Sequence, residues 1–367
     1  MMDAHILKAG VAIQDRYDVI QYLDAGGMQE VFIAKDRILG RLVALKTPKN
    51  SSAAKRFEQS ASMSARINNP YVARTFDYIL YDDKQFLVEE LVDGVNLDVF
   101  LKGFIPRLDP HQVCQIAQQF ARGLRASHHV GVIHRDLKPN NLLVQVVQGR
   151  LNVKITDFGI AKLTEEVLAE AAKNQQTIQN SSTMFGALPF MSPELIDNPK
   201  AVSEAVDIWS FGSIIYYLLS GAFPFGDKLS AIAKIMSGVL PPDPDASVQN
   251  SQFKPLAKEI WEIIKPCFSQ DPKNRPNASA LATQLADVCY CTLPRFQGVV
   301  DKFGEGNGEF GYITSASYTF FHRASLSTGE PEKGQKVYFS THLGRPHPRA
   351  HPIVPILADP ETARLAK

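Results

Sequence analysis

The segment VIHRDLKPNNLL, residues 132–143, combines acidic, basic and amide side chains with apolar residues on both flanks. The apolar flanks predict burial, and buried charges of opposite sign cost free energy unless a charged ligand lies between them. A phosphate and a metal ion together would compensate such a set of side chains. We therefore expect this segment to form part of a nucleotide site.

Length and charge narrow the class of protein. At 367 residues the chain is too long for one small core, so two to three compact units are expected. A formal net charge of +1 argues against bulk duplex DNA as the partner. The four cysteines show no C-x-x-C spacing, which favours a reducing compartment.

The sequence shows neither a membrane span nor a secretion signal. The most apolar run, residues 208–225, contains Ser, Gly and Pro, and it predicts a buried core helix. The first ten residues lack the sustained apolar core of a signal peptide. We therefore expect a cytoplasmic protein with no membrane partner.

Changes in composition divide the chain into units. Short strand-like runs come first, long helical patterns follow, and the end is rich in aromatic and β-branched residues punctuated by Gly and Pro. Asp109 before Pro110 predicts the start of a long helix that stops at Gly131. The predicted units are an N-terminal extension at 1–16, a mixed unit at 17–92, a helical unit at 93–292 and a small all-β unit with its tail at 293–367.

Five further motifs accompany HRDLKPNN. VALK ends at Lys46, DFG begins at Asp157, GALPFMSPE ends at Glu194, DIWSFG begins at Asp207, and DPKNRP contains Arg275. In order and spacing this set resembles the Ser/Thr protein kinase superfamily, and the loop GGMQEV is similar to its bacterial members. The resemblance covers roughly residues 17–290 and implies a bilobal α+β fold. It also implies that Asp207 and a pair between Glu194 and Arg275 hold the scaffold.

The resemblance implies a chemical role for five polar residues. Asp136 would accept or orient the substrate hydroxyl, Lys138 would lie near the transferred γ-phosphate, and Lys46 would bind the α- and β-phosphates of ATP. Asn141 and Asp157 would hold magnesium, because two oxygen ligands on separate loops suit a hard cation that keeps water and phosphate as its other ligands. Proteins are the implied phosphate acceptors, and the chain itself is among them.

Other residues are implied to enclose the nucleotide, and they are Gly26, Gly27, Val31, Ala44, Glu90 and Leu143. The two glycines let backbone N–H groups approach phosphate. For Val31, Ala44 and Leu143, ordinary core packing is the alternative. The loop departs from the family pattern where Asp24 and Gln29 replace two glycines, and a carboxylate at Asp24 would disfavour a polyanion.

The acid that pairs with the strand lysine in this family is missing from its usual place. Ser60 stands there, and the nearest acid, Glu58, is displaced by a rotation of about 200° around a helix. Glu89 occupies a position that is usually apolar, on the strand next to that of Lys46. An unpaired buried carboxylate would be costly, so we predict that Glu89 pairs with Lys46.

The activation segment implied by the resemblance, residues 157–194, carries two more predictions. Residues 164–176 read as an amphipathic helical insert. The candidate phosphorylation sites are Ser181, Ser182 and Thr183. Arg135 would bind their phosphates, although a simple polar loop is the alternative. Ala187 replaces a Thr that Ser/Thr kinases usually have.

The C-terminal unit resembles a cold-shock domain, a small OB-fold barrel that stacks single-stranded bases on aromatic rings. The resemblance rests on GVVDKFGEGNGEFGYI, YTFFHRASL and EKGQKVYFS, and its stacking residues would be Phe310, Tyr312, Phe320 and His322. From Leu293 onward there are nine Lys or Arg and seven Asp or Glu, too few basic residues for tight phosphate binding alone. Aromatic residues that fill a core are the alternative.

Two function classes follow from these patterns. The first is an ATP-dependent Ser/Thr protein kinase with an accessory barrel. The second is a pseudokinase-like protein whose barrel binds single-stranded nucleic acid or a protein partner, as the departures at Asp24, Gln29 and Ser60 would allow. The chain retains four charged or amide residues that the resemblance assigns to phosphate, substrate and metal, namely Lys46, Asp136, Asn141 and Asp157. Their retention favours the enzyme, because a degenerate site has no physical reason to keep them.

Overall fold

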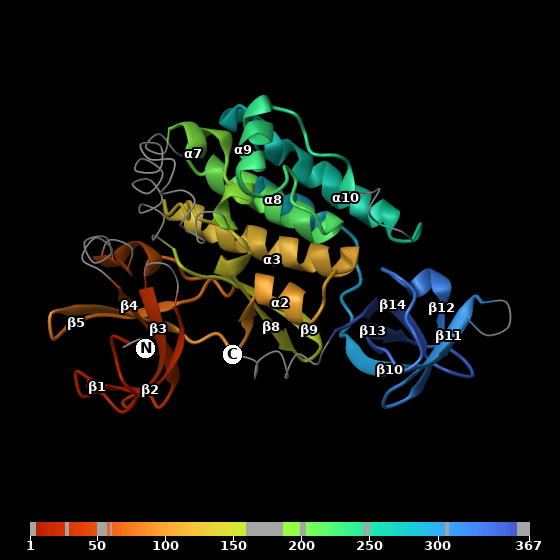
Figure 1. Ribbon diagram of the computed structural model, residues 1–367, viewed down its shortest axis with the longest axis horizontal. Helices are drawn as coiled ribbons and strands as arrows, with labels where there is room; N and C mark the ends of the chain where they lie inside the picture. Colours follow the sequence, from red (N-terminus) through yellow and green to blue (C-terminus); the bar gives the residue numbers. More distant parts are fainter. Residues whose placement is uncertain are drawn as a thin grey trace.

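The computed structural model describes residues 5–25, 29–49, 57–58, 61–158, 186–198, 203–244, 248, 250–304 and 308–357. A β-rich lobe, a helical lobe and a β-barrel follow one another along the long axis of the molecule (Figure 1). The bilobal α+β fold and the small all-β unit predicted from the sequence are therefore confirmed. Within these ranges, no helix is long and apolar enough to cross a membrane.

The first lobe contains a six-stranded sheet in the order β1-β2-β3-β4-β6-β5. Its strands are β1 (Ala12–Ile13), β2 (Tyr17–Ala25), β3 (Gln29–Asp36), β4 (Leu42–Pro48), β5 (Thr75–Tyr81) and β6 (Lys84–Glu90). Side chains alternate between the two faces, and one face is a core that includes Phe32, Leu45 and Phe86. Lys46 and Glu89 lie on the opposite face. In the antiparallel register Glu89 faces Ala44, which makes it a diagonal neighbour of Lys46.

The second lobe is built around two long helices. Its helices are α2 (Leu97–Gly103), α3 (Pro110–His129), α7 (Pro193–Asp197), α8 (Ala205–Ser220), α9 (Lys228–Ser237), α10 (Lys254–Ile264) and α11 (Ala278–Asp287). Asp109 caps α3 with a reciprocal bond to Gln112, so the predicted start of this helix is confirmed. The predicted core helix is α8, which is apolar and buried on nearly every side.

A short antiparallel sheet carries the segments on which the site depends. Its strands are β7 (Val95–Asn96), β8 (Leu142–Val147) and β9 (Arg150–Ile155). β8 follows the HRDLKPNN loop directly, and β9 leads into Asp157. The hairpin of β8 and β9 therefore places two motifs that are some twenty residues apart next to each other.

The C-terminal unit is a closed barrel of five strands in the order β10-β11-β12-β14-β13. The strands are β10 (Phe296–Phe303), β11 (Phe310–Thr314), β12 (Tyr318–His322), β13 (Lys336–His342) and β14 (Arg349–Pro355). Alternate residues such as Ile313, Phe321 and Phe339 fill its core. Gly311 is required in this core, because a Cβ atom would lie 2.5 Å from the Phe321 ring.

The barrel packs against the helical lobe through buried contacts. Arg295, just before β10, places Nη2 2.8 Å from Oδ2 of Asp109, and both side chains are almost fully buried. The Tyr338 ring lies 5.8 Å from that of Phe104, centroid to centroid, and Tyr338 belongs to the core cluster of the helical lobe. At Gly149, in the β8–β9 turn, an added Cβ atom would lie 2.3 Å from the Arg295 carbonyl oxygen. The chain leading into the barrel is therefore fitted closely to this turn.

Candidate active site

Lys46 lies at the centre of a buried charged cluster between the first two lobes. Its Nζ atom is 2.5 Å from Oε2 of Glu89 and 2.8 Å from Oδ1 of Asp157. It also donates a hydrogen bond to the Thr156 hydroxyl oxygen at 3.1 Å. The structure thus brings together three residues that the sequence singled out and adds Thr156, which belongs to no motif.

The pKa values of this cluster follow from burial and charge. Burial would lower the pKa of Lys46, but the carboxylates of Asp157 and Glu89 outweigh burial and raise it. Burial would raise the pKa of Asp157, yet Lys46 and Gln29 hold it below the usual value. For Glu89 burial prevails over the attraction of Lys46, so its pKa is raised. Of the two carboxylates that contact Lys46, Glu89 therefore takes up a proton before Asp157 as the pH falls.

The HRDLKPNN loop forms a second polar group around Asp136. Lys138 places Nζ 2.8 Å from Oδ2 of Asp136. Asn141, at the end of the short 3₁₀ helix η1 (Pro139–Asn141), donates to the backbone oxygen of Asp136 at 2.6 Å and to its Oδ2 at 3.2 Å. The amide nitrogen of Asn141 is thus used within the loop, which leaves the amide oxygen available to a ligand.

Asp207 on α8 fixes the backbone of that loop. It is completely buried and accepts hydrogen bonds at 2.8 Å from the backbone nitrogens of His134 and Arg135. The side chain of His128 donates to it at the same distance, since Asp207 is the acceptor. Arg135 has a φ of 66°, a conformation that these bonds hold in place. The structure therefore gives Asp207 the scaffolding position that the sequence implied.

The Glu194 and Arg275 side chains form the second scaffold contact. Nη1 and Nη2 of Arg275 lie 2.6 and 2.8 Å from the two carboxylate oxygens of Glu194. Arg275 also donates to the backbone oxygens of Ala205 and Ser269. This two-pronged pair ties the start of α7 to the rest of the helical lobe.

Phe158 and the backbone of Asp157 determine where the Asp157 carboxylate points. Asp157 has a φ of 64°, in the left-handed region that non-glycine residues rarely adopt. The following side chain, Phe158, is buried with its ring centroid 4.7 Å from that of His134. With Phe158 packed inward, the Asp157 carboxylate faces Lys46.

Gln29 makes a contact that the sequence did not predict. Its Nε2 atom donates to Oδ1 of Asp157 at 2.7 Å, and its side chain is buried. In the sequence, Gln29 stood out only because it replaces a glycine of the family's loop pattern. Gln29 is the first residue of β3, and nothing in its local sequence indicates a partner 128 positions away. Asp24 is exposed.

Four of the six residues predicted to enclose the nucleotide lie in the described part of the chain. Val31 lies opposite Lys46 in the register of β3 and β4, and Ala44 is buried on the same face of the sheet. Leu143 is half-buried on β8. The carboxylate of Glu90 lies 2.9 Å from Nζ of Lys154, so this side chain is already engaged in an ion pair.

Several predicted residues lie outside the described part of the chain. They are Gly26, Gly27, Ser60, Ser181, Ser182 and Thr183, together with the insert at 164–176. Ala187 is described, and it is buried in a small apolar cluster with Leu188 and Met191.

The aromatic residues of the barrel lie on one face of the β11–β12 hairpin. Tyr312 faces Phe320, and Phe310 faces His322, in the antiparallel register. The Phe320 ring centroid is 5.7 Å from that of Tyr312 and 6.0 Å from that of Phe310. Tyr318 stacks on Tyr312 at 4.9 Å, and this ring was not predicted. All these rings are at least partly exposed, whereas the intervening residues face the barrel core.

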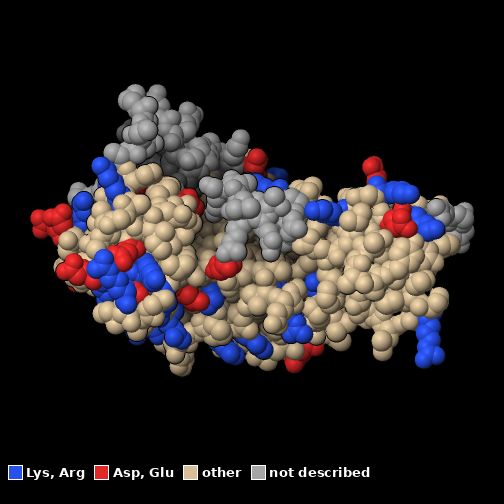
Figure 2. All heavy atoms as spheres, turned by 90° about the horizontal axis from the view of Figure 1, so that it is seen from below, with Lys and Arg blue, Asp and Glu red and all other residues tan. Residues whose placement is uncertain are grey.

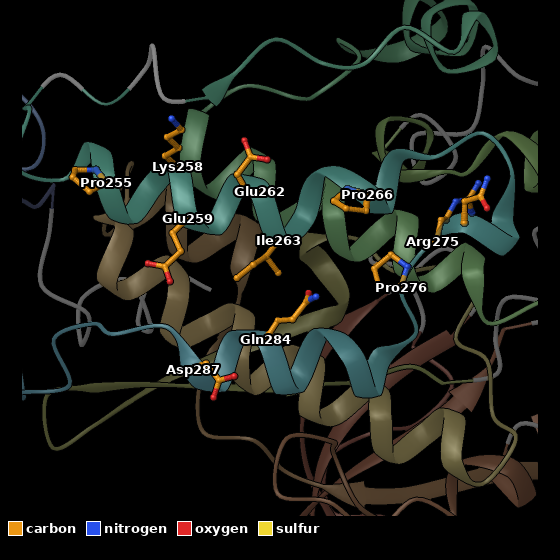
Figure 3. Close-up of a pocket in the computed structure, with 11 residues that line it drawn as sticks. Pro255, Lys258, Glu259, Glu262, Ile263, Pro266, Arg275, Pro276, Gln284 and Asp287 are labelled. Carbon is orange, nitrogen blue, oxygen red and sulfur yellow. The ribbon is translucent and has the colours of Figure 1, made fainter.

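A separate hollow of about 890 Å³ lies between α10 and α11, on the helical lobe. Figure 3 shows Ile263 and Gln284 facing each other across it, with Glu259 and Asp287 at one end. Arg275 at the other end is the partner of Glu194. The hollow includes none of the residues predicted for phosphate, metal or substrate.

Comparison with known proteins assigns the family. Residues 17–285 match the model of the protein kinase domain. The chain is 32% identical over 269 residues to the probable serine/threonine-protein kinase PknB of Lactococcus lactis, covering 70% of this chain and 41% of that protein. It is 28% identical over 271 residues to the serine/threonine-protein kinase PrkC of Bacillus subtilis, covering 72% and 39%.

A solved kinase domain shows the same fold. The PknI kinase domain of Mycobacterium tuberculosis superposes with a TM-score of 0.55 at 21% identity, over 77% of this chain and 99% of that one. The chain thus belongs to the protein kinase family. It spans about two fifths of the length of the two bacterial relatives named above.

Proposed function

We propose that this chain is an ATP-dependent Ser/Thr protein kinase that phosphorylates protein hydroxyls, its own among them. The observation that supports this best is the pairing of two polar groups at the junction of the lobes. Lys46 with Asp157 provides charges for phosphate and metal, and Asp136 with Lys138 provides charges for the hydroxyl and the transferred phosphate. A nucleotide phosphate together with a metal cation is the ligand that suits both groups, because the cation offsets the carboxylates while the lysines face the phosphates.

The residues fit magnesium as the accompanying ion. Asp157 contributes a carboxylate, and Asn141 contributes an amide oxygen that the loop does not use. No cluster of three or more His, Cys, Asp or Glu suited to a metal exists among the described residues. Magnesium needs no such cluster, because it keeps water and phosphate oxygens as most of its ligands. When bound, the ion would neutralise charge on the phosphates.

Each side chain then has a task in the transfer. Asp136 orients the acceptor hydroxyl and takes up its proton, with Asn141 and Lys138 fixing the position of the carboxylate. Lys46 binds the phosphates that remain with the nucleotide. The test is incubation of the purified chain with labelled ATP and magnesium, followed by identification of phosphoserine and phosphothreonine. Absence of any label would contradict the proposal.

The aromatic face of the barrel supports a second activity, the binding of single-stranded nucleic acid. Phe310 stacks on Phe320 and Tyr312 stacks on Tyr318, while Tyr312 meets Phe320 edge to face, so four neighbouring rings of one hairpin provide a platform for bases. Lys302 places its Nζ 5.9 Å from the centroid of the Tyr312 ring. On the face shown in Figure 2, basic and acidic residues are interleaved and no broad basic field is seen. Stacking, more than phosphate attraction, would then provide the affinity.

The experiment for the barrel uses the whole chain and a fluorescent single-stranded oligonucleotide. Tyr312→Ala should weaken binding by ~1–3 kcal/mol, the usual contribution of one stacked base. Tyr81→Ala is the matched control, because Tyr81 is an exposed tyrosine of the first lobe. Failure of the wild-type chain to bind at low salt would exclude this activity and favour a protein partner for the barrel.

A further inference from the structure

In this family a helix of the first lobe supplies the acid that pairs with the strand lysine. In this chain, the described residues of that helix that face the sheet include no acid. Among the described residues of 57–64, those that pack against the sheet are Phe57, Ala61 and Ser64. Phe57 and Ala61 contact Leu87, and the hydroxyl of Ser64 lies 2.8 Å from that of Thr75. Glu58 is exposed. The described inner face of this helix is therefore apolar or hydroxylic and carries no charge for Lys46.

Glu89 reaches Lys46 from within the sheet. It is 4% exposed, and its carboxylate lies 2.5 Å from Nζ of Lys46. The two residues are held by the β4–β6 ladder, in which Ala44 faces Glu89 and Lys46 faces Leu87. A buried carboxylate without this partner would cost several kcal/mol, which explains why an acid is tolerated at this place.

Gln29 completes the arrangement from a third strand. Its amide donates to the same Asp157 oxygen that Lys46 contacts, Oδ1. A chain of contacts thus runs from Glu89 through Lys46 and Asp157 to Gln29, and three of these four residues stand on the sheet of the first lobe. The fourth, Asp157, is followed by Phe158, which is buried in the core of the helical lobe beside the His134 ring.

We propose that Glu89 is the positioning residue of Lys46, so that the sheet itself, and not the helix, supplies the acid that aligns this lysine with the nucleotide phosphates. The proposal rests on the kinase function proposed above. A pair fixed by a strand ladder keeps its geometry whether or not the helix moves. Alignment of Lys46 is therefore independent of helix position, and control of the enzyme must act on another element.

Two substitutions at Glu89 separate positioning from packing. Glu89→Gln keeps the size and an oxygen that can accept from Lys46, whereas Glu89→Met fills the space with an apolar side chain. The dissociation constant for ATP with magnesium, kcat and the thermal midpoint would be measured for both. Glu58→Gln is the matched control, since it removes a neighbouring exposed acid.

If Glu89 positions Lys46, activity follows the order wild type, Glu89→Gln, Glu89→Met. We expect Glu89→Met to lose about 10²-fold in kcat, because a misplacement near 1 Å has that effect, and to bind ATP at least about tenfold more weakly. Glu58→Gln should stay within about twofold of wild type. If Glu89 served packing alone, Glu89→Met would be the more stable and more active of the two Glu89 variants, since Met suits an apolar site better than Gln.

The direct binding measurement separates this proposal from the kinase function. A wild-type chain that binds ATP but transfers no phosphate would contradict the kinase function, while weaker ATP binding by Glu89→Met would still support the role of Glu89. Phosphate transfer by the wild type with unchanged ATP binding and kcat in both Glu89 variants would overturn the role of Glu89. Loss of activity in Glu58→Gln comparable to that in Glu89→Met would overturn it as well. If Glu89→Met does not fold, the ATP affinity and kcat of Glu89→Gln are compared with those of Glu58→Gln. A larger loss in Glu89→Gln supports the role of Glu89, and equal values overturn it.

Discussion

At the scale of single residues, the charged side chains of the motifs fall into two groups, those proposed to act on substrate or metal and those that hold the scaffold, and their surroundings differ. Asp136 and Asp157 face the junction of the lobes and stay partly accessible, with side chains 17% and 22% exposed. Asp207 and Arg275 are enclosed, and their hydrogen bonds go to backbone atoms and to a fixed partner. Substitutions in the second group should therefore act on stability before activity.

Arg275→Ala provides the test of the scaffold group. The guanidinium is completely buried against Glu194, so its removal leaves a partly buried carboxylate without its cation and should cost ~3–5 kcal/mol. The measurement is the free energy of unfolding in urea. Lys273→Ala, two residues away and exposed, should change stability by less than about 0.5 kcal/mol. Equal stability of the two variants would show that the pair is dispensable.

At this scale, the sequence predicted what contiguous motifs and strand alternation encode. HRDLKPNN places Asp136, Lys138 and Asn141 within one loop, so their proximity follows from the motif itself. Glu89 could be paired with Lys46 because side chains on one face of neighbouring strands meet. The bond from Gln29 to Asp157 joins residues 128 positions apart, and no local pattern carries that information.

At the scale of elements, α3 and the β8–β9 hairpin both extend from the active site to the barrel. One end of the hairpin carries Asn141 and Asp157, while its turn accepts a hydrogen bond from the Arg295 backbone nitrogen at 2.7 Å. The N-terminus of α3 carries Asp109, which caps the helix and also binds the Arg295 side chain. The sequence predicted the cap, but the partner of Asp109 depends on docking of two units and was not foreseen.

The Asp109–Arg295 pair should behave as a buried ion pair. Asp109→Asn keeps an N-cap oxygen but leaves the Arg295 charge without its partner, so we expect a loss of ~3–5 kcal/mol in stability. In the double variant Asp109→Asn with Arg295→Met no charge is left buried. It should therefore lose less than the sum of the two single variants, by unfolding measurements in a double-mutant cycle. Strict additivity would mean that the two side chains do not interact.

At the scale of the whole molecule, the contact between barrel and helical lobe contains histidines that are held neutral. Burial, with the charges of His111 and His342 next, lowers the pKa of His351 to about 4. Burial also lowers the pKa of His111. The charged and titratable groups facing His351 are His111, His342, Asp109 and Arg295. Its ring stacks on Phe253, with centroids 5.5 Å apart.

These shifts predict a stability that depends on pH. In the unfolded chain His351 takes up a proton below about pH 6.5, the ordinary pKa of His. In the folded chain it stays neutral until the pH approaches 4, so protonation favours unfolding between these two values. The contribution of neutral His351 to the free energy of unfolding is therefore fully present above about pH 6.5. It is lost as the pH falls from there toward 4. The thermal midpoint of the wild type should drop between pH 7 and pH 5, and the drop should be smaller in His351→Gln. An equal drop in both would mean that His351 does not contribute.

The central claim is that the junction of the lobes transfers phosphate from ATP, and one measurement tests it directly. The purified chain would be incubated with labelled ATP and magnesium beside Asp136→Asn and Asp157→Asn. We expect the wild type to incorporate label on Ser or Thr and each variant to lose 10²- to 10⁴-fold or more, because each removes a group that acts on substrate or metal. Their thermal midpoints should stay close to that of the wild type, since Lys46 keeps Glu89 when Asp157 is replaced. Variants that retain activity within a few fold of the wild type would contradict the account.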